Sequence, residues 1–254
     1  MTMIRPGGEA LTIKAARKAN LPEGSIILDM GCGEGDTAAL LARDFGFKAT
    51  GVDASYKMIE RGKKKYPELD LRNMEAEHLE FESRVFDAVF MECSLSVMRI
   101  QEDAAFEAYC VLKPGGKLII TDLYFPDPDP AAVATMLAAA KEKRERPRVK
   151  GDCGENTRPS VVMLDGAFIV DELAAMLEDI GFELECFENV SYALTEFAAQ
   201  AIMEHGSLAE YFKSVIPEEE DPATYYACAA FGDEKNRPKK PGYFLMILRK
   251  GNAD

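Results

Sequence analysis

Short apolar runs alternate with amphipathic stretches along the first half of the chain. Runs rich in β-branched and aliphatic residues predict buried strands over residues 25–30, 47–53, 69–74, 86–93 and 117–124. The stretches between them carry apolar residues at helical spacing and predict helices over residues 9–19, 36–46, 55–67 and 101–112. This regular alternation predicts an α/β fold, in which helices cover both faces of a parallel sheet.

Capping and turn residues between these elements predict where the elements begin and end. Asp36 is expected to cap the second helix at its start, and Gly46 to end it. The sequence "KPGG" at residues 113–116 predicts a turn between the fourth helix and the fifth strand.

The rhythm changes after residue 125, where "FPDPDP" predicts a turn. Residues 131–145 predict a helix, and residues 146–165 have no period and predict a loop. The alternation then resumes, with helices expected over 168–181, 192–205 and 207–215 and strands over 182–190 and 243–250.

Composition and charge narrow the class of protein. The 254 residues are 47% hydrophobic and 29% charged, which is typical of one large globular α/β domain. A formal net charge of −14 repels phosphate groups, so nucleic acids and anionic membranes are not expected as partners. The start of the chain has no apolar segment behind a basic one, and no run has the length of a membrane span, so the predicted location is cytoplasmic.

Six cysteines are scattered along the chain without any CxxC pair, which argues against a zinc site or a disulfide framework. No metal site is therefore expected, and most of the thiols are predicted to be small buried hydrophobes. The cysteines are Cys32, Cys93, Cys110, Cys153, Cys186 and Cys228.

A glycine-rich turn, "DMGCGEGD" (residues 29–36), follows the first predicted strand and carries the first candidate chemistry. Its glycines have the spacing G-x-G-x-G, not the G-x-G-x-x-G spacing of dinucleotide-binding folds. Asp29 precedes the glycines and Glu34 lies among them, and two carboxylates suit a ligand with positive charge better than a pyrophosphate. Asp53 ends the second strand, where an acidic residue can accept hydrogen bonds from two ribose hydroxyls. A nicotinamide-dependent oxidoreductase is therefore disfavoured.

Four motifs, in this order along the chain, are similar to those of a known family: "LDMGCGEGD", "GVDAS", "FDAVFMECSLSV" and "LKPGGKLIITDLY". Together they closely resemble the class I S-adenosylmethionine-dependent methyltransferases of the UbiE-like type, over roughly residues 20–125. The resemblance implies a Rossmann-like, doubly wound sheet of seven strands in which the last strand, "GYFLMILRK", is antiparallel. It also implies S-adenosylmethionine as the cofactor.

The resemblance carries site roles onto positions of this chain. Asp29 would orient the aminoacyl part of the cofactor, Asp53 would bind the ribose, and Glu92 and Cys93 would border the methionine moiety. Glu75 stands where the family usually has an aspartate toward the adenine, and Glu80 where it has a proline. The full set implied for cofactor binding is Asp29, Gly31, Cys32, Gly33, Asp53, Ala54, Met58, Glu75, Ala76, Glu92 and Cys93.

The predicted organisation is a single domain over residues 1–254. Residues 20–125 form its cofactor-binding core, and the insertions 126–165 and 189–235 form a lid over the substrate. The N-terminal segment is expected to fold over the cofactor, as such segments do in the family. Within it, Arg5 is expected either to contact a carboxylate or to cap the first helix.

The predicted reaction is methyl transfer to a small-molecule acceptor by in-line displacement, which depends mainly on holding donor and acceptor in line. A base is needed only for an acceptor that must lose a proton. The candidates for a catalytic group are Asp122, Tyr124, Cys93 and His205. Asp122 and Tyr124 are equally well explained as a turn-capping aspartate and a packed tyrosine. The oligomeric state stays open.

Two alternatives remain open. Cys153 lies in a polar loop, "KGDCGEN", and this segment is faintly similar to arsenite methyltransferases, so metalloid or thiol methylation is one alternative. The other alternative is a protein that binds S-adenosylmethionine without catalysis, as a sensor or scaffold.

Overall fold

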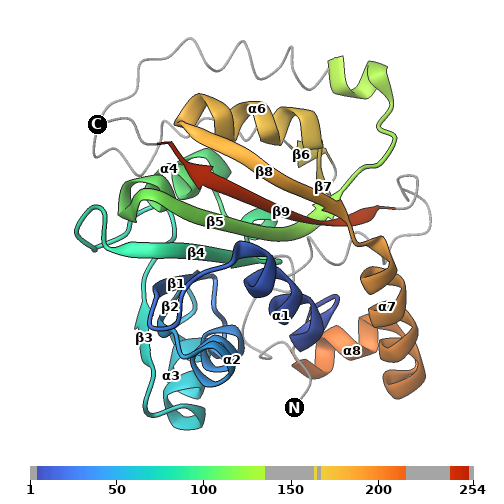
Figure 1. Cartoon of the computed structure of the whole chain (residues 1–254). Helices are drawn as coiled ribbons and strands as arrows, with labels where there is room; N and C mark the ends of the chain where they lie inside the picture. The colour runs from blue at the N-terminus through green and yellow to red at the C-terminus, as the bar shows by residue number, and fades with distance from the viewer. Residues whose placement is uncertain (1–4, 135–162, 165–166, 216–240, 252–254) are drawn as a thin grey trace.

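One mixed sheet runs through the centre of the protein in the computed structural model, which describes residues 5–134, 163–164, 167–215 and 241–251 (Figure 1). Its strands are β1 (Ile26–Met30), β2 (Lys48–Asp53), β3 (Asp70–Asn73), β4 (Phe86–Glu92), β5 (Leu112–Tyr124), β8 (Phe182–Asn189) and β9 (Gly242–Lys250). Their order across the sheet is β3-β2-β1-β4-β5-β9-β8. Strands β1 to β5 pair in parallel, whereas β9 is antiparallel to both β5 and β8. The predicted doubly wound sheet with an antiparallel last strand is therefore confirmed.

A short hairpin at the end of β5 was not predicted. It consists of β6 (Met163–Leu164) and β7 (Ala167–Phe168), and Phe168 pairs with Tyr124. Strands of two residues are too short to produce an alternating pattern, so periodicity placed Met163 and Leu164 in a loop and Phe168 in the following helix.

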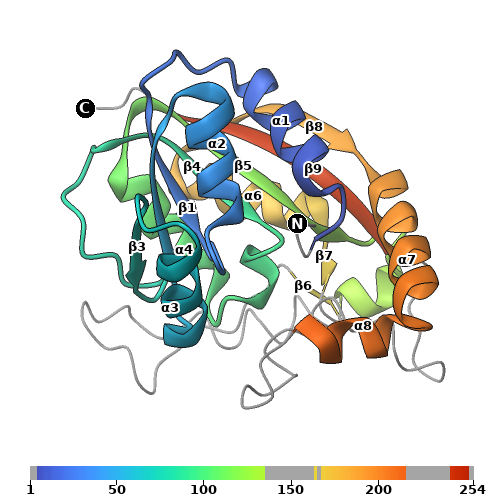
Figure 2. The same cartoon turned by 90° about the horizontal axis from the view of Figure 1, so that it is seen from below.

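The helices cover both faces of the sheet (Figures 1 and 2). They are α1 (Gly8–Ala19), α2 (Asp36–Phe45), α3 (Tyr56–Lys65), α4 (Gln101–Val111), α6 (Val170–Ile180), α7 (Ser191–His205) and α8 (Leu208–Val215), with a 3₁₀ turn η1 (Leu95–Val97). Helices α4 and α6 pack on one face, and α1 and α2 pack on the other. Helix α7 begins beside the start of β9. Together with α8, it extends beyond the end of the sheet at which β9 starts (Figure 1). A further helical turn begins at residue 130, but most of the predicted helix 131–145 lies outside the described residues.

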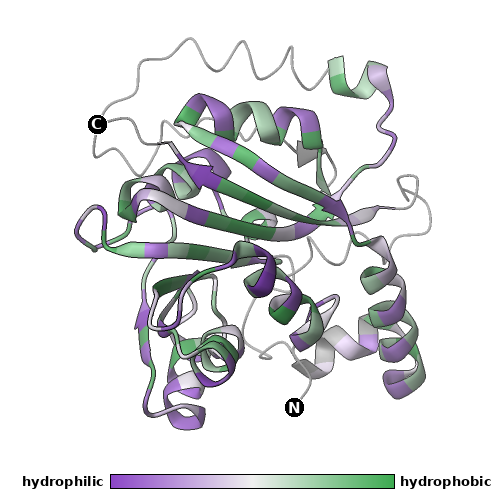
Figure 3. Cartoon of the chain, in the orientation of Figure 1, coloured by the Kyte–Doolittle hydropathy of each residue, from purple (hydrophilic) through white to green (hydrophobic). Residues whose placement is uncertain are grey.

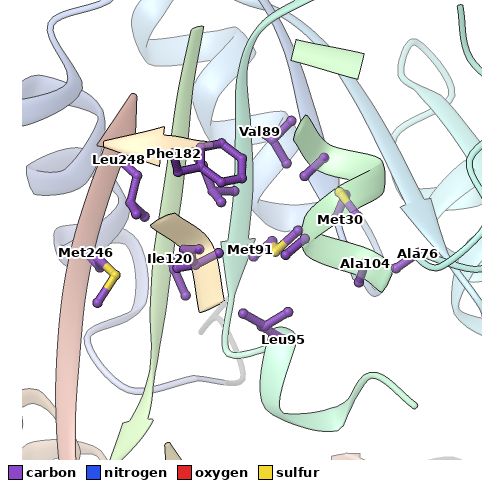
Figure 4. Packing of buried hydrophobic residues seen from close by; sticks show 14 of the residues in the cluster. Met30, Ala76, Val89, Met91, Leu95, Ala104, Ile120, Phe182, Met246 and Leu248 are labelled. Atoms are coloured by element: carbon purple, nitrogen blue, oxygen red, sulfur yellow. The ribbon is translucent and has the colours of Figure 1, made fainter. Parts of the chain in front are cut away.

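Apolar side chains of the central strands fill the two cores. Hydrophobic residues run along β5 and β9, as Figure 3 shows, and nearly all of β9 is buried. The close view in Figure 4 shows part of the core under α4 and α6, where strand side chains meet Ala104 of α4. Its members from the strands include Met30, Val89, Met91, Ile120, Met246 and Leu248. Because both faces are covered, these strands read in the sequence as nearly continuous apolar runs.

Two predicted turn details are wrong. Helix α2 is capped by Gly35, and Asp36 is its first helical residue, whose carboxylate accepts a hydrogen bond from Lys65 Nζ at 2.6 Å. Local preference could not foresee this contact, because Lys65 belongs to the next helix. The "KPGG" sequence lies inside β5, where it forms a bulge: Phe86 pairs with Leu112 but Ala88 pairs with Lys117.

Lys250 is a buried cation at the edge of the sheet opposite the carboxyl ends of the parallel strands. Its Nζ donates to the carbonyl oxygens of Tyr109 at 2.6 Å and Leu112 at 2.8 Å, where α4 ends. We expect Lys250→Met to lower the free energy of unfolding by about 2–4 kcal/mol, since two charge-assisted hydrogen bonds to buried carbonyls are lost. Urea denaturation measures this loss, and cofactor affinity should not change.

Arg249→Met is the matched control for this prediction. Arg249 lies on the same strand, but its ion pairs with Glu183 and Glu185 are partly exposed. Its loss should therefore cost no more than about 1 kcal/mol. An equal loss in both variants would contradict the role given to Lys250.

Candidate cofactor and methyl-transfer site

The glycine-rich loop between β1 and α2 is folded tightly at the carboxyl edge of the sheet. The backbone N–H groups of Gly31 and Cys32 both donate to Val52 O of β2, at 2.8 and 3.0 Å. Gly31 has a φ of 77°, and a Cβ there would lie 2.5 Å from the Cβ of Ser94, which follows β4. Only glycine fits this position, so the loop brings its backbone to the point where β1, β2 and β4 end.

Asp29, the acid in β1, has an unusual electrostatic environment at this edge of the sheet. Its carboxylate is buried, and within the described part of the chain its Oδ2 atom has no hydrogen-bond partner. Burial, the largest cause, and the negative charge of Glu92 raise the pKa of Asp29 to about 8, while Arg5 opposes the shift. An unbonded buried carboxylate oxygen is costly, so this position fits a ligand that brings a donor or a positive charge.

Asp53, at the end of β2, links the glycine-rich loop to the start of α3 through hydrogen bonds. Its Oδ2 accepts the Gly33 N–H and its Oδ1 accepts the Ser55 N–H, both at 2.8 Å. Each carboxylate oxygen can accept more than one hydrogen bond, so these contacts are compatible with hydroxyl donors from a ligand. The side chain is half-buried, at the edge where the strands end.

Glu34 does not act as a second acid toward a ligand. Its carboxylate turns toward α3, 3.3 Å from Lys65 Nζ and 3.8 Å from Arg61. These ion pairs neutralise the negative charge of Glu34, which was expected from the sequence to face the ligand. The preference for a positive ligand group therefore depends on Asp29.

Glu92, at the end of β4, lies in a buried network. Its Oε2 lies 2.7 Å from Arg5 Nη2 and accepts the Thr37 hydroxyl at 2.9 Å, and Thr12 donates to the same carboxylate at 3.1 Å. Arg5 therefore contacts a carboxylate, and it also donates to the Gly8 carbonyl in the first turn of α1 at 3.2 Å. Sequence reasoning missed Thr12 and Thr37, because a threonine on a helix carries no distinctive pattern.

The remaining predicted cofactor residues surround this edge to different degrees. Cys32 is buried, and burial raises the pKa of its thiol well above the ordinary value. Met58 is buried close to Gly33, and Ala76 is buried, whereas Ala54 is exposed. Glu75 is exposed, 3.9 Å from Arg99.

Two of the four catalytic candidates are engaged in the core. Asp122 is fully buried and accepts the N–H groups of Ser96 at 2.9 Å and Leu123 at 2.8 Å. Burial raises its pKa to about 6. The Tyr124 ring packs edge-on against Phe187 and Phe244.

The other two candidates lie in different places. Cys93 follows β4 directly and is partly exposed, with a φ of 56°, and its N–H donates to Thr121 O at 2.6 Å. His205 ends α7 and is exposed, with its ring edge-on to Tyr211. Cys93 thus adjoins the glycine loop, whereas His205 belongs to the α7–α8 pair.

Cys153, on which the metalloid alternative depended, lies outside the described residues. Within the described ranges no three His, Cys, Asp or Glu side chains gather as metal ligands would. Nor does any helix in those ranges combine the length and apolar character needed to cross a bilayer.

The strand order, the antiparallel β9 and the acids at the ends of β1 and β2 define a Rossmann-like fold of the methyltransferase class. Residues 27–116 match the family described as methyltransferase domain. The chain is 27% identical to the O-methyltransferase cnsE of Penicillium expansum, over 80% of this chain and 73% of the relative. It is 28% identical to 27-O-demethylrifamycin SV methyltransferase of Amycolatopsis mediterranei, over 94% and 82% of the two chains. The domain match and these relatives support an S-adenosylmethionine-dependent methyltransferase.

A solved structure adds a neighbour with another chemistry. The [4+2]-cyclase SpnF superposes with a TM-score of 0.64 and 26% identity, over 96% of this chain and 82% of that one. The comparisons favour neither the sensor nor the metalloid alternative.

Proposed function

We propose that the enzyme methylates a hydroxyl oxygen of a small organic molecule, with S-adenosylmethionine held between the ends of β1, β2 and β4. The observation that carries the cofactor assignment is the buried Asp29 Oδ2 without a partner in the described chain. An ammonium group such as that of the cofactor's aminoacyl end supplies what this oxygen lacks. One relative is named an O-methyltransferase and the other a methyltransferase of 27-O-demethylrifamycin SV, and both names support an oxygen acceptor.

In this proposal, different residues at this edge of the sheet bind different parts of the cofactor. Asp29 pairs with the ammonium group, and Gly31 and Gly33 allow the backbone to approach the ligand. Asp53 accepts the ribose hydroxyls alongside its backbone N–H donors. The adenine side is formed by Ala54, Met58, Glu75 and Ala76, and the methionine side by Cys32, Glu92 and Cys93.

S-adenosylmethionine supplies an electrophilic methyl group on a sulfonium. The work of the protein is then to orient the acceptor in line with that methyl group and to exclude water. The acceptor oxygen bonds to the methyl carbon as the carbon–sulfur bond breaks, which leaves S-adenosylhomocysteine, and the hydroxyl proton is lost to solvent. Asp122 and Tyr124 are held by backbone N–H groups and aromatic rings, so positioning rather than proton removal is assigned to this part of the site. In this proposal, helices α7 and α8, within the segment 189–235, form part of a lid over the acceptor. Most of the other predicted lid segment, 126–165, lies outside the described residues.

The direct test is turnover with a panel of hydroxylated small molecules. The purified protein is incubated with S-adenosylmethionine labelled in its methyl group, and both S-adenosylhomocysteine and labelled product are quantified. We expect both to form in equal amounts with at least one acceptor. Consumption of an acceptor without release of S-adenosylhomocysteine would indicate a cyclase-like chemistry, and cofactor binding without turnover across a broad panel would indicate a sensor.

A further inference from the structure

The Arg5 guanidinium connects three elements that are distant in the sequence. It contacts Glu92 at the end of β4, Thr37 in the first turn of α2 and Thr12 of α1. Arg5 and Glu92 are both almost completely buried. A buried ion pair repays its desolvation only with good geometry and additional hydrogen bonds, and this one has both.

The turn before α1 is built to bring Arg5 back onto the sheet. Gly7 and Gly8 follow "RP" with φ values of 78° and 44°, both in the left-handed region. A Cβ at Gly7 would lie 2.5 Å from the Cβ of Leu11, so no larger residue fits. The turn, and not a long flexible side chain alone, therefore determines where the guanidinium lies.

The charge of Arg5 matters for Asp29. The acids Asp29 and Glu92 lie close enough to oppose each other's ionisation, and Arg5 compensates one of the two charges. With the Arg5–Glu92 pair formed, Asp29 is the acid of this group that is left to bind a cation. Without Arg5, two buried acids compete, and the ends of α1, α2 and β4 lose their common partner.

We propose that Arg5 is a positioning residue for methyl transfer, which holds the N-terminal segment and Glu92 against the cofactor site so that cofactor binding and closure of this segment are coupled. The inference rests on the proposed function. It assigns Arg5 an effect on the cofactor without direct contact.

The test compares Arg5→Met, Arg5→Lys and Lys14→Met in the full-length protein. Lys14 is the matched control, because it ties the same helix to β8 through Glu188 at a partly exposed position. We expect Arg5→Met to raise the KM and Kd for S-adenosylmethionine by at least about tenfold, with a smaller effect on kcat. Arg5→Lys should be intermediate, because an ammonium group can pair with Glu92 but cannot also bridge Thr12 and Thr37. Lys14→Met should match the wild type.

Hydrogen exchange provides the readout that a purely structural role would not change. S-adenosylhomocysteine should protect the amides of residues 7–12 in the wild type and in Lys14→Met, and not in Arg5→Met. Lower stability of Arg5→Met and Arg5→Lys with wild-type Kd, KM and protection would overturn the inference. If Arg5→Met does not fold, Arg5→Lys alone decides. A wild-type protein that binds no S-adenosylmethionine would instead refute the proposed function.

Discussion

Asp29→Asn is expected to make the ligand-free protein more stable at neutral pH while it weakens S-adenosylmethionine binding. The amide is neutral without binding a proton, whereas the buried Asp29 carboxyl, with no partner on Oδ2 within the described chain, must take up a proton at neutral pH to stay uncharged. The substitution also removes a charge-assisted contact to the cofactor's ammonium group, worth about 1.5–3 kcal/mol. The Kd should therefore rise by about ten- to a hundredfold. Isothermal titration calorimetry measures the Kd, and urea denaturation measures the free energy of unfolding.

The pH dependence of this effect follows from the pKa of Asp29, which burial raises from its ordinary value of 3.8 to about 8 in the folded protein. Between these values the folded protein holds a proton that the unfolded chain has lost. The unfolded state thus binds fewer protons, and the free energy of unfolding falls as the pH rises from about 4 to about 8. Asp29→Asn should remove this contribution, so its stability should decline less over the same range.

Cofactor binding should be coupled to the same proton. Below pH 8, an ammonium group can pair with Asp29 only after the carboxyl group loses its proton, so binding should release close to one proton per site. Calorimetry in two buffers with different ionisation enthalpies measures this release, which should disappear in Asp29→Asn. Asp44→Asn, an exposed acid on α2, is the control and should leave both quantities unchanged. Equal proton release in Asp29→Asn and the wild type would show that Asp29 does not bind the ammonium group.

The elements that were predicted well from the sequence depend on contacts between neighbours in the chain. Strand–helix alternation from residue 26 to residue 124 follows from the period of apolar positions, and the structure confirms it. The roles of Glu34 and Asp36 could not be predicted, because both depend on Lys65 of α3. Their partner becomes visible only when the helices are placed side by side.

The same limit applies to the most buried charges. Arg5 and Glu92 are separated by 87 positions, and nothing local to either residue indicates the other. The motif identified Asp29, but it indicates neither that Oδ2 has no partner within the described chain nor that Arg5 is paired with Glu92. Sequence motifs thus locate this edge of the sheet, whereas its charge balance is a property of the folded chain.

Asp53→Ala is expected to weaken S-adenosylmethionine binding more than the loss of one ligand contact would. The carboxylate accepts the Gly33 and Ser55 N–H groups, so its removal releases the glycine loop as well as the hydrogen bonds to the ribose. Two charge-assisted hydrogen bonds at about 1.5–3 kcal/mol each predict a Kd at least about a hundredfold higher.

Asp53→Asn separates the two contributions. The amide keeps one acceptor oxygen, so it can still bind one of the two N–H groups, and its Kd should lie between those of the wild type and Asp53→Ala. Asp70→Ala is the control, because Asp70 lies on the neighbouring strand β3 and pairs with Arg72 on the surface. Calorimetric titration with S-adenosylhomocysteine measures all four proteins without turnover. If Asp53→Ala bound S-adenosylhomocysteine with the Kd of the wild type, another residue would have to bind the ribose. The loop contacts are also lost in this variant, so they could not make up for a lost contact to the ligand.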